Sequence, residues 1–112
     1  MILIFKYLIP KGYTGVTIYP FVFLKNDTLK EDKVLINHEY IHLKQQLELL
    51  IVPFYFIYGF EFLIRLIQYR GWKIAYRNIS FEREAYYNED DMEYLKTRKN
   101  WRFLKYIRTN DF

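Results

Sequence analysis

The sequence of 112 residues predicts a single, mainly helical α+β domain of about four helices with a small β element at its N-terminus. Two short runs rich in β-branched and aromatic residues lie before residue 25, which predicts the strands. Apolar residues then recur at helical spacing from Leu35 to Leu49. An apolar segment interrupted by Pro53 follows, and further helical patterns complete the chain, so one domain spans residues 1–112.

The composition limits the classes of protein to which this chain can belong. Hydrophobic residues make up 52% of the chain and aromatic residues 21%, which is enough for a core tiled with rings at this length. Cysteine is absent, so neither disulfides nor thiolate metal sites form, and a reducing, cytoplasmic compartment is expected. The apolar start, Met1–Pro10, is short, contains Lys6 and lacks a small-residue cleavage site, so it is a poor signal peptide.

The β element is predicted from two runs, Met1–Ile9 and Val16–Leu24. Pro20 interrupts the second run and indicates an edge strand or a broken strand, because proline donates no hydrogen bond to a ladder. We expect a two-stranded element such as a hairpin. It either covers the core or holds an extended substrate through main-chain hydrogen bonds.

The first long helix is predicted to run from Leu29 to about Leu50. The sequence Thr28-Leu29-Lys30-Glu31 before it fits a capping box, in which the Thr hydroxyl caps the helix and the Glu reaches back. One stripe at helical spacing contains Leu35, His38, Ile41, His42, Gln45 and Leu49. The two histidines are therefore expected on the inward face, between apolar neighbours.

A second helix is predicted within the apolar segment Leu47–Ile67, starting at Pro53. Glu61 and Arg65 are spaced to form an ion pair on it. The uncharged stretch has 12 residues, fewer than the roughly 20 that span a membrane. A buried core helix is the favoured interpretation, and a segment lying on or partly in a bilayer is the alternative. The predicted core residues are Leu35, Ile41, Leu49, Phe54, Phe56, Ile57, Phe60, Leu63, Leu66 and Phe81.

The C-terminal part predicts a helical turn at Trp72–Tyr76 and a helix from Phe81 to about Thr97 capped by Ser80. A short final helix is expected at Trp101–Ile107. The net charge is +4, and a basic cluster consists of Lys96, Arg98, Lys99, Arg102, Lys105 and Arg108. We interpret the cluster as the solvated face of a last helix, with a surface for anionic partners as the alternative. Nucleic-acid binding has no recognisable motif in this chain.

Residues 38–42 read HExxH and contain both histidines of the chain. On a helix this spacing places His38 and His42 on one face, where both imidazoles can reach a single metal ion. Zinc suits two imidazoles and one carboxylate with a fourth position for water, and Glu39 is placed to take that water's proton. The simpler alternative is an amphipathic helix with two half-buried histidines and a solvated glutamate.

A catalytic zinc site needs a third protein ligand, which must be a carboxylate here. The downstream acids are Glu48, Glu61, Glu82, Glu84, Glu89 and those beyond. Glu48 lies too close on the same helix, and Glu61 has Arg65 as a partner. Glu82 and Glu84 open a separate helix that can pack across the motif helix. Their alternative role is to be helix-start acids that favour the macrodipole.

The HExxH motif followed by Glu82-Arg83-Glu84-Ala85, a Glu-x-x-Ala sequence, resembles the gluzincin group of zinc metallopeptidases. The chain also resembles small membrane-linked sensor peptidases and phage-type antirepressor peptidases, which share a zincin-like two-helix core. The resemblance covers these two helices only. It implies Zn²⁺ held by His38, His42 and Glu82, with Glu84 as the alternative ligand and Glu39 as general base. Tyr86 stands where those families often have an aspartate that orients a histidine.

The resemblance implies a zinc-dependent hydrolase, most directly a metallopeptidase that acts on a peptide or protein substrate. The alternative is a non-catalytic, zincin-derived binding module that docks on a membrane surface or a protein partner. Changing Glu39 to Gln separates the two, because a catalyst loses turnover and keeps its metal. Tyr40, Tyr86 and Tyr87 are candidates for a transition-state hydrogen-bond donor. Asn37, beside the first histidine, has no assigned role.

Overall fold

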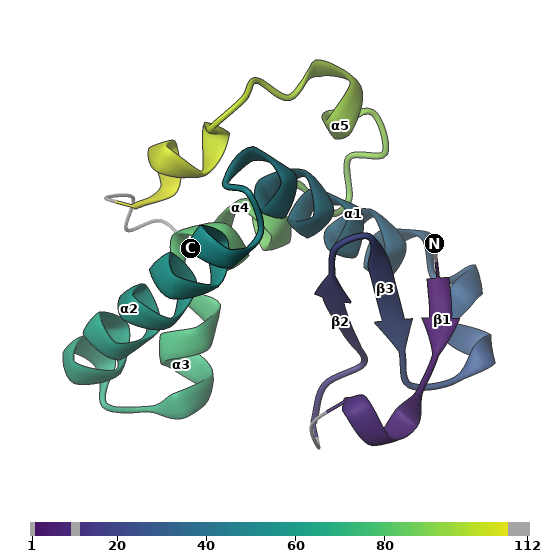
Figure 1. The fold of residues 1–112 in the computed structure, drawn as a ribbon, viewed down its shortest axis with the longest axis horizontal. Helices are drawn as coiled ribbons and strands as arrows, with labels where there is room; N and C mark the ends of the chain where they lie inside the picture. Colours follow the sequence, from purple (N-terminus) through teal and green to yellow (C-terminus); the bar gives the residue numbers. More distant parts are fainter. Residues whose placement is uncertain (1, 10–11, 108–112) are drawn as a thin grey trace.

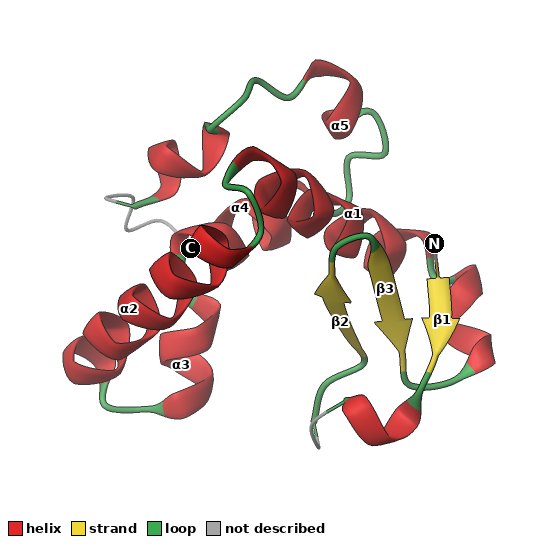
Figure 2. Ribbon diagram, viewed as in Figure 1, coloured by secondary structure: helices red, strands yellow, loops and turns green. Residues whose placement is uncertain are grey.

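The structure is a computed structural model that describes residues 2–9 and 12–107. Within these ranges three strands come first and five α-helices follow, with three short 3₁₀ helices among them (Figure 1). The mainly helical α+β class is as the sequence predicted. The sheet lies at one end of the molecule, and the helices α2 (Val52–Tyr69) and α3 (Trp72–Arg77) lie at the other (Figure 2).

The sheet has three strands in the order β1-β3-β2 within the described residues, one more than expected. Its strands are β1 (Ile2–Ile4), β2 (Gly15–Ile18) and β3 (Phe21–Leu24). Strand β3 is central, parallel to β1 and antiparallel to β2. The run 16–24 contains two strands because Pro20 lies in the turn between them, where its missing N–H removes no ladder bond. Strand β2 is therefore an edge strand, and it packs against α1.

Helix α1 (Lys33–Glu48) carries the HExxH motif. It begins later than predicted, because residues Asp27–Glu31 form the 3₁₀ helix η2 instead of the first helical turn. The cap is Asp32, whose carboxylate accepts a hydrogen bond of 3.1 Å from the amide of Leu35. The prediction that Thr28 caps this helix was wrong, since its hydroxyl donates to a neighbouring side chain in the loop.

Helix α2 (Val52–Tyr69) has a proline in its first turn, as the sequence predicted. Its Glu61–Arg65 ion pair is present, with 3.5 Å between Oε2 and Nη2. The expectation of a buried core helix was wrong: Phe54 and Arg65 are its buried residues, and its outer side is exposed. Apolar content predicted burial but did not reveal that the domain covers only one side of this helix.

The length and hydropathy of the helices bear on whether any of them could cross a membrane. Among the described residues, no single helix is both long and apolar enough to cross a membrane. Helices α1 and α2 satisfy that criterion of length and composition only as a pair, and they are bent by 113° at the break between them.

The C-terminal half contains α3 (Trp72–Arg77), α4 (Ser80–Asn88), α5 (Tyr94–Thr97) and the 3₁₀ helix η3 (Arg102–Tyr106). The single helix predicted from Phe81 to Thr97 is thus two helices, and η3 replaces the predicted final α-helix.

The start of α4 is set by another helix. Ser80 was predicted as the N-cap, but it is the first helical residue, and Ile79 holds the cap position. The amide and the hydroxyl of Ser80 both donate to the carboxylate of Glu61 on α2, each at 2.6 Å. A tertiary partner therefore satisfies the helix start that a local cap was expected to satisfy.

The end of α4 is held by α1. Asn37 donates its side-chain amide to the backbone carbonyls of Glu89 at 2.9 Å and Asp91 at 3.0 Å. These carbonyls lie just past the last helical residue, Asn88. Asn37, which had no role from sequence, fixes the turn in which the predicted helix breaks.

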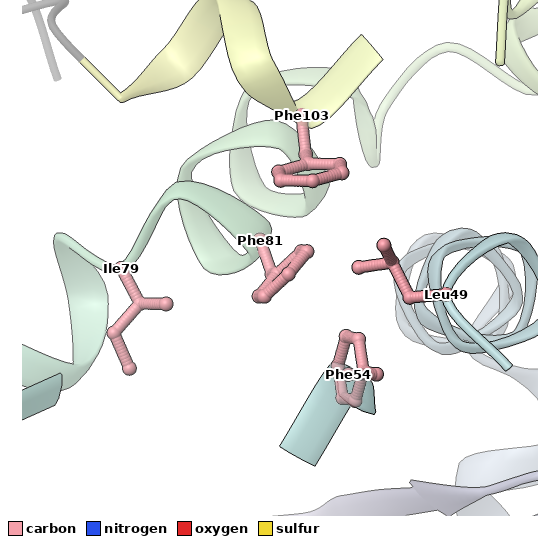
Figure 3. Packing of buried hydrophobic residues seen from close by; sticks show 5 residues of the cluster. All are labelled: Leu49, Phe54, Ile79, Phe81 and Phe103. Carbon is pink, nitrogen blue, oxygen red and sulfur yellow. The ribbon is translucent and has the colours of Figure 1, made fainter. Parts of the chain in front are cut away.

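The core is an aromatic cluster between the helices. Its buried members are Leu49, Phe54, Ile79, Phe81 and Phe103 (Figure 3). Burying each such side chain contributes roughly 1.5–3 kcal/mol to the free energy of folding. Of the predicted core, Ile41, Leu49, Phe54 and Phe81 are buried, Leu35 and Leu66 are half-buried, and Phe56, Ile57, Phe60 and Leu63 are exposed.

The predicted C-terminal basic face is wrong at Arg98. This guanidinium is 1% exposed and lies between two buried carboxylates, those of Glu48 on α1 and Glu84 on α4. Its Nη1 is 2.7 Å from Glu48 Oε2, and its Nε donates to Glu84. Arg108, also assigned to that face, lies outside the described residues.

Candidate metal centre

Helices α1 and α4 cross and bring the HExxH histidines against the first turn of α4. Glu82 Oε1 lies 3.2 Å from His38 Nε2 and 3.0 Å from His42 Nε2. One ligand atom from each of these three residues lies within 4.8 Å of the others, in an arrangement that could hold a metal ion. All three residues are at most 5% exposed.

The proton position on His42 follows from its neighbour Gln45, one turn further along α1. Gln45 Nε2 donates to the carbonyl of Phe81 at 3.1 Å, so its Oε1 is the acceptor. That oxygen lies 2.8 Å from His42 Nδ1, which must therefore carry a proton. The Nε2 lone pair of neutral His42 then points toward Glu82.

His38 is oriented in the same way by a carboxylate. Its Nδ1 lies 2.9 Å from Glu89 Oε2, which can only accept when ionised. His38 Nε2 is left to face Glu82, beside the Nε2 of His42. Such pairs of histidine and outer acceptor are typical of metal sites, where they fix the tautomer and raise the basicity of the ligand.

Three acceptor atoms, the Nε2 atoms of His38 and His42 and Oε1 of Glu82, thus face one another in the protein interior. Their lone pairs require positive charge between them. Burial opposes charging His38, but Glu82 and Glu89 outweigh it and raise the pKa of His38 to about 10. Burial likewise opposes a charge on His42, and Glu82 raises its pKa nevertheless. The two imidazoles overcome the effect of burial on Glu82 and hold its pKa below the usual range. Protons satisfy the site without metal, and a divalent cation can replace them.

The donor set fits zinc. Two imidazole nitrogens and one carboxylate oxygen are the protein ligands of one common type of catalytic zinc site, which keeps a fourth position open. The other oxygen of Glu82 accepts a hydrogen bond of 2.7 Å from the Tyr58 hydroxyl, which holds the carboxylate in place.

Glu39 lines a cavity that two of the three candidate ligands, His42 and Glu82, also line. The cavity has a volume of about 460 Å³, and Glu39, His42 and Glu82 are among its lining residues. Thr17 on β2 donates to Glu39 Oε1 at 3.0 Å and fixes the carboxylate. Burial raises the pKa of Glu39, although the two histidines partly oppose it. The aromatic wall of the cavity consists of Tyr13, Phe54, Tyr55, Tyr58, Phe62, Trp72 and Tyr76.

Gly15 leaves room at Glu39. A Cβ atom at this position would lie 3.3 Å from Glu39 Oε2, 3.2 Å from a methyl carbon of Leu24 and 3.4 Å from the carbonyl of Phe23. Any side chain would crowd the carboxylate that lines the cavity. No local pattern in the sequence indicates this role of Gly15, because its proximity to Glu39 depends on how β2 packs on α1.

The edge of β2 is only partly available to a substrate. The carbonyl of Thr17 already accepts hydrogen bonds from Gln46 and Tyr55, each at 2.7 Å. Gln46 also accepts from the amide of Tyr19 at 2.7 Å. Main-chain binding of an extended peptide along the whole strand would have to displace these contacts.

Glu84 and the three tyrosines that the sequence suggested for the site lie outside the group of ligands. Glu84, the alternative ligand, instead bonds Gln45, Tyr94 and Arg98. Of the proposed donors, Tyr86 lies against His38 with 4.4 Å between ring centroids, while Tyr87 is 64% exposed. Neither of these nor Tyr40 lines the cavity, whereas Tyr58 and Tyr76 do.

Glu89 is the residue that sequence reasoning undervalued. It supplies the acid beside a histidine that, in the families this sequence resembles, an aspartate at the place of Tyr86 often supplies. Its spacing was a usable signal, since Glu82 and Glu89 are seven residues apart and fall on the same side of a helix.

In comparisons with known proteins, no family model, no curated protein and no solved structure matches this chain. The functional argument therefore rests on the geometry of the buried group His38, His42 and Glu82.

Proposed function

We propose that this protein is a zinc-dependent hydrolase, most directly a metallopeptidase. One observation carries the proposal: Glu39 lines the same cavity as His42 and Glu82, two members of the buried His-His-Glu group. A purely structural histidine pair does not require an additional buried acid that is fixed by Thr17 and faces open space.

Each residue has a distinct part in this proposal. His38, His42 and Glu82 hold the ion, and Glu89 and Gln45 keep the imidazoles in the required tautomer. When bound, zinc supplies a Lewis acid that polarises a carbonyl and lowers the pKa of water toward neutrality.

Glu39 accepts a proton from water and returns it to the leaving amine. Burial raises the pKa of Glu39, which makes its carboxylate a stronger base than an exposed glutamate. Tyr58 and Tyr76 present phenol groups on the cavity wall. Burial raises the pKa of both phenols, so they keep their protons. Tyr58 donates a hydrogen bond to Glu82 and so positions that carboxylate.

The cavity wall indicates the class of substrate. It is largely aromatic, and its volume of about 460 Å³ lies in the range of small-ligand pockets. A peptide with a large apolar side chain next to the cleaved bond fits this lining. The substrate class follows from the wall alone and does not depend on which metal is bound.

The decisive experiment measures zinc content and peptide cleavage on the same preparations. Wild-type protein is expected to hold about one zinc per chain and to cleave a fluorogenic peptide library rich in Phe and Leu. Glu39→Gln should keep the zinc and lose roughly 10²–10⁴-fold in turnover. His38→Ala should lose both. Glu31→Gln, on the exposed 3₁₀ helix η2, is the matched control and should change neither.

Two outcomes would contradict the proposal. Absence of zinc after reconstitution would remove the metal centre. Bound zinc without any cleavage that depends on Glu39 would favour the non-catalytic binding module, for which Glu39 has no chemical role.

A further inference from the structure

The outer side of α2 is an exposed apolar surface. We call it the α2 face, and it consists of Val52, Phe56, Ile57, Phe60, Leu63, Ile64 and Ile67. Phe56 is 75% exposed and Ile67 is 79% exposed. The outward side of a surface helix normally carries charged and polar residues. In Figure 1, α2 runs along the margin of the molecule, with α3 beside it.

The two charged residues of α2 point toward the domain instead of toward solvent. Glu61 caps Ser80 at the start of α4. Arg65 is 9% exposed and donates to the carbonyl of Ile107 at 2.7 Å. The polarity of α2 is therefore reversed: ionic groups attach the helix to the protein, and apolar groups face outward.

The charges around the α2 face have one sign. Between Leu49 and Phe81 the single acid, Glu61, pairs inside the protein with Arg65, and the other charged residues are the basic residues Arg70, Lys73 and Arg77. Arg70 and Lys73 are exposed at the C-terminal end of α2. This arrangement complements an anionic surface.

We propose that the α2 face docks onto an anionic lipid bilayer, with α2 lying in the plane of the interface. The helix has 18 residues and is about 27 Å long, and its outward side has no charged group along that length. Trp72, 64% exposed, stands at its end beside Arg70 and Lys73. An apolar helix side bordered by an aromatic ring and basic residues is typical of interfacial helices.

A bilayer fits this face better than a second copy of the chain. A protein partner is positioned by hydrogen bonds and by a polar rim around the apolar centre. The outward side of α2 offers side-chain donors or acceptors only near its C-terminal end, at Gln68 and Arg70. Two copies packed with their α2 helices parallel would also bring the like charges of Arg70 and Lys73 near each other, whereas anionic headgroups attract them.

The first test is co-sedimentation with vesicles of 70% phosphatidylcholine and 30% phosphatidylserine. Wild-type protein is expected to bind them, and Phe56→Ser/Phe60→Ser/Ile67→Ser should weaken partitioning by about tenfold or more. Phe5→Ser/Tyr7→Ser is the matched control, because both residues are exposed and belong to the segment between β1 and β2, at the end of the molecule opposite α2 (Figure 1). All five positions are exposed, so the variants should fold, and far-UV circular dichroism verifies this.

The second test separates charge from apolar contact. Arg70→Glu/Lys73→Glu should weaken binding to the anionic vesicles about tenfold, and wild-type protein should bind pure phosphatidylcholine less well. In a Trp101→Phe background, Trp72 emission should shift to the blue on binding. Because the α2 face contains no metal ligand, zinc-free protein should bind equally well, which separates this proposal from the proposed catalysis.

Three results would overturn the proposal. One is no binding to the anionic vesicles, and another is equal binding to neutral vesicles. The third is a dimer that forms through the α2 face, disrupted by the triple serine variant, without any vesicle binding.

Discussion

At the scale of single residues, the candidate metal centre has two layers. His38, His42 and Glu82 face one another, and Glu89 and Gln45 hold the backs of the imidazoles. The inner layer decides whether an ion can bind. The outer layer decides which ring nitrogen is free to bind the ion. Loss of the outer layer should therefore lower the affinity for zinc without removing a ligand.

Glu89→Ala tests the outer layer. Without the carboxylate at 2.9 Å, His38 Nδ1 has no fixed acceptor and its ring can turn. Zinc affinity is expected to fall about 10–100-fold, measured by competition with a chromophoric chelator. Glu93→Ala is the control, because Glu93 pairs with Lys96 on the surface and should leave zinc affinity unchanged. Equal affinities for Glu89→Ala and wild type would show that Glu89 does not orient His38.

The sequence predicted the inner layer because its cues are local or nearly so. His38 and His42 were recognisable from a four-residue spacing. The start of a later helix indicated Glu82 or Glu84, and the resemblance of the Glu-x-x-Ala sequence favoured Glu82. Gly15 and Thr17 were not recognisable. Their contacts with Glu39 exist only because the edge strand β2 packs on α1. No spacing along the chain encodes that packing.

At the scale of elements, boundaries were predicted where a local signal sets them and missed where a distant residue does. Pro53 marks the start of α2 from its own position. The start of α4 depends on Glu61, and its end depends on Asn37. The apolar pattern of α2 was recognised, but its burial was not, since composition cannot tell which side of a helix the domain covers.

Arg98 connects elements that are far apart in sequence. It pairs with Glu48 on α1 and Glu84 on α4, and Glu84 also accepts a hydrogen bond of 2.9 Å from Gln45, the residue behind His42. Arg98→Ala leaves two buried carboxylates without their cation. The free energy of unfolding should fall by about 3–5 kcal/mol, measured by urea denaturation monitored by circular dichroism.

Lys96→Ala is the matched control for Arg98→Ala. Lys96 is a neighbouring cation whose pair with Glu93 is exposed, so its removal should change stability by no more than about 0.5 kcal/mol. Similar losses in the two variants would mean that the buried ion pairs of Arg98 do not hold α1 and α4 together.

At the scale of the whole molecule, the cavity lies where the parts of the chain meet. Its lining draws on β2, α1, α2, α3 and α4. The ligand atoms come only from α1 and α4, and 40 residues separate His42 from Glu82. An ion at this place would therefore cross-link two helices that also carry the core, so metal binding and global stability should be coupled.

Zinc removal tests this coupling. An ion that binds only the folded chain, present at 100 times its dissociation constant, adds about 2.7 kcal/mol to the free energy of unfolding. For a domain of this size that corresponds to a rise in Tm of about 10 °C, measured by differential scanning calorimetry with zinc and with a chelator. Glu39→Gln keeps all three ligands and should show the full shift, whereas His42→Ala should show none. A Tm that is the same with zinc and chelator in wild-type protein would mean that the ion does not join α1 to α4.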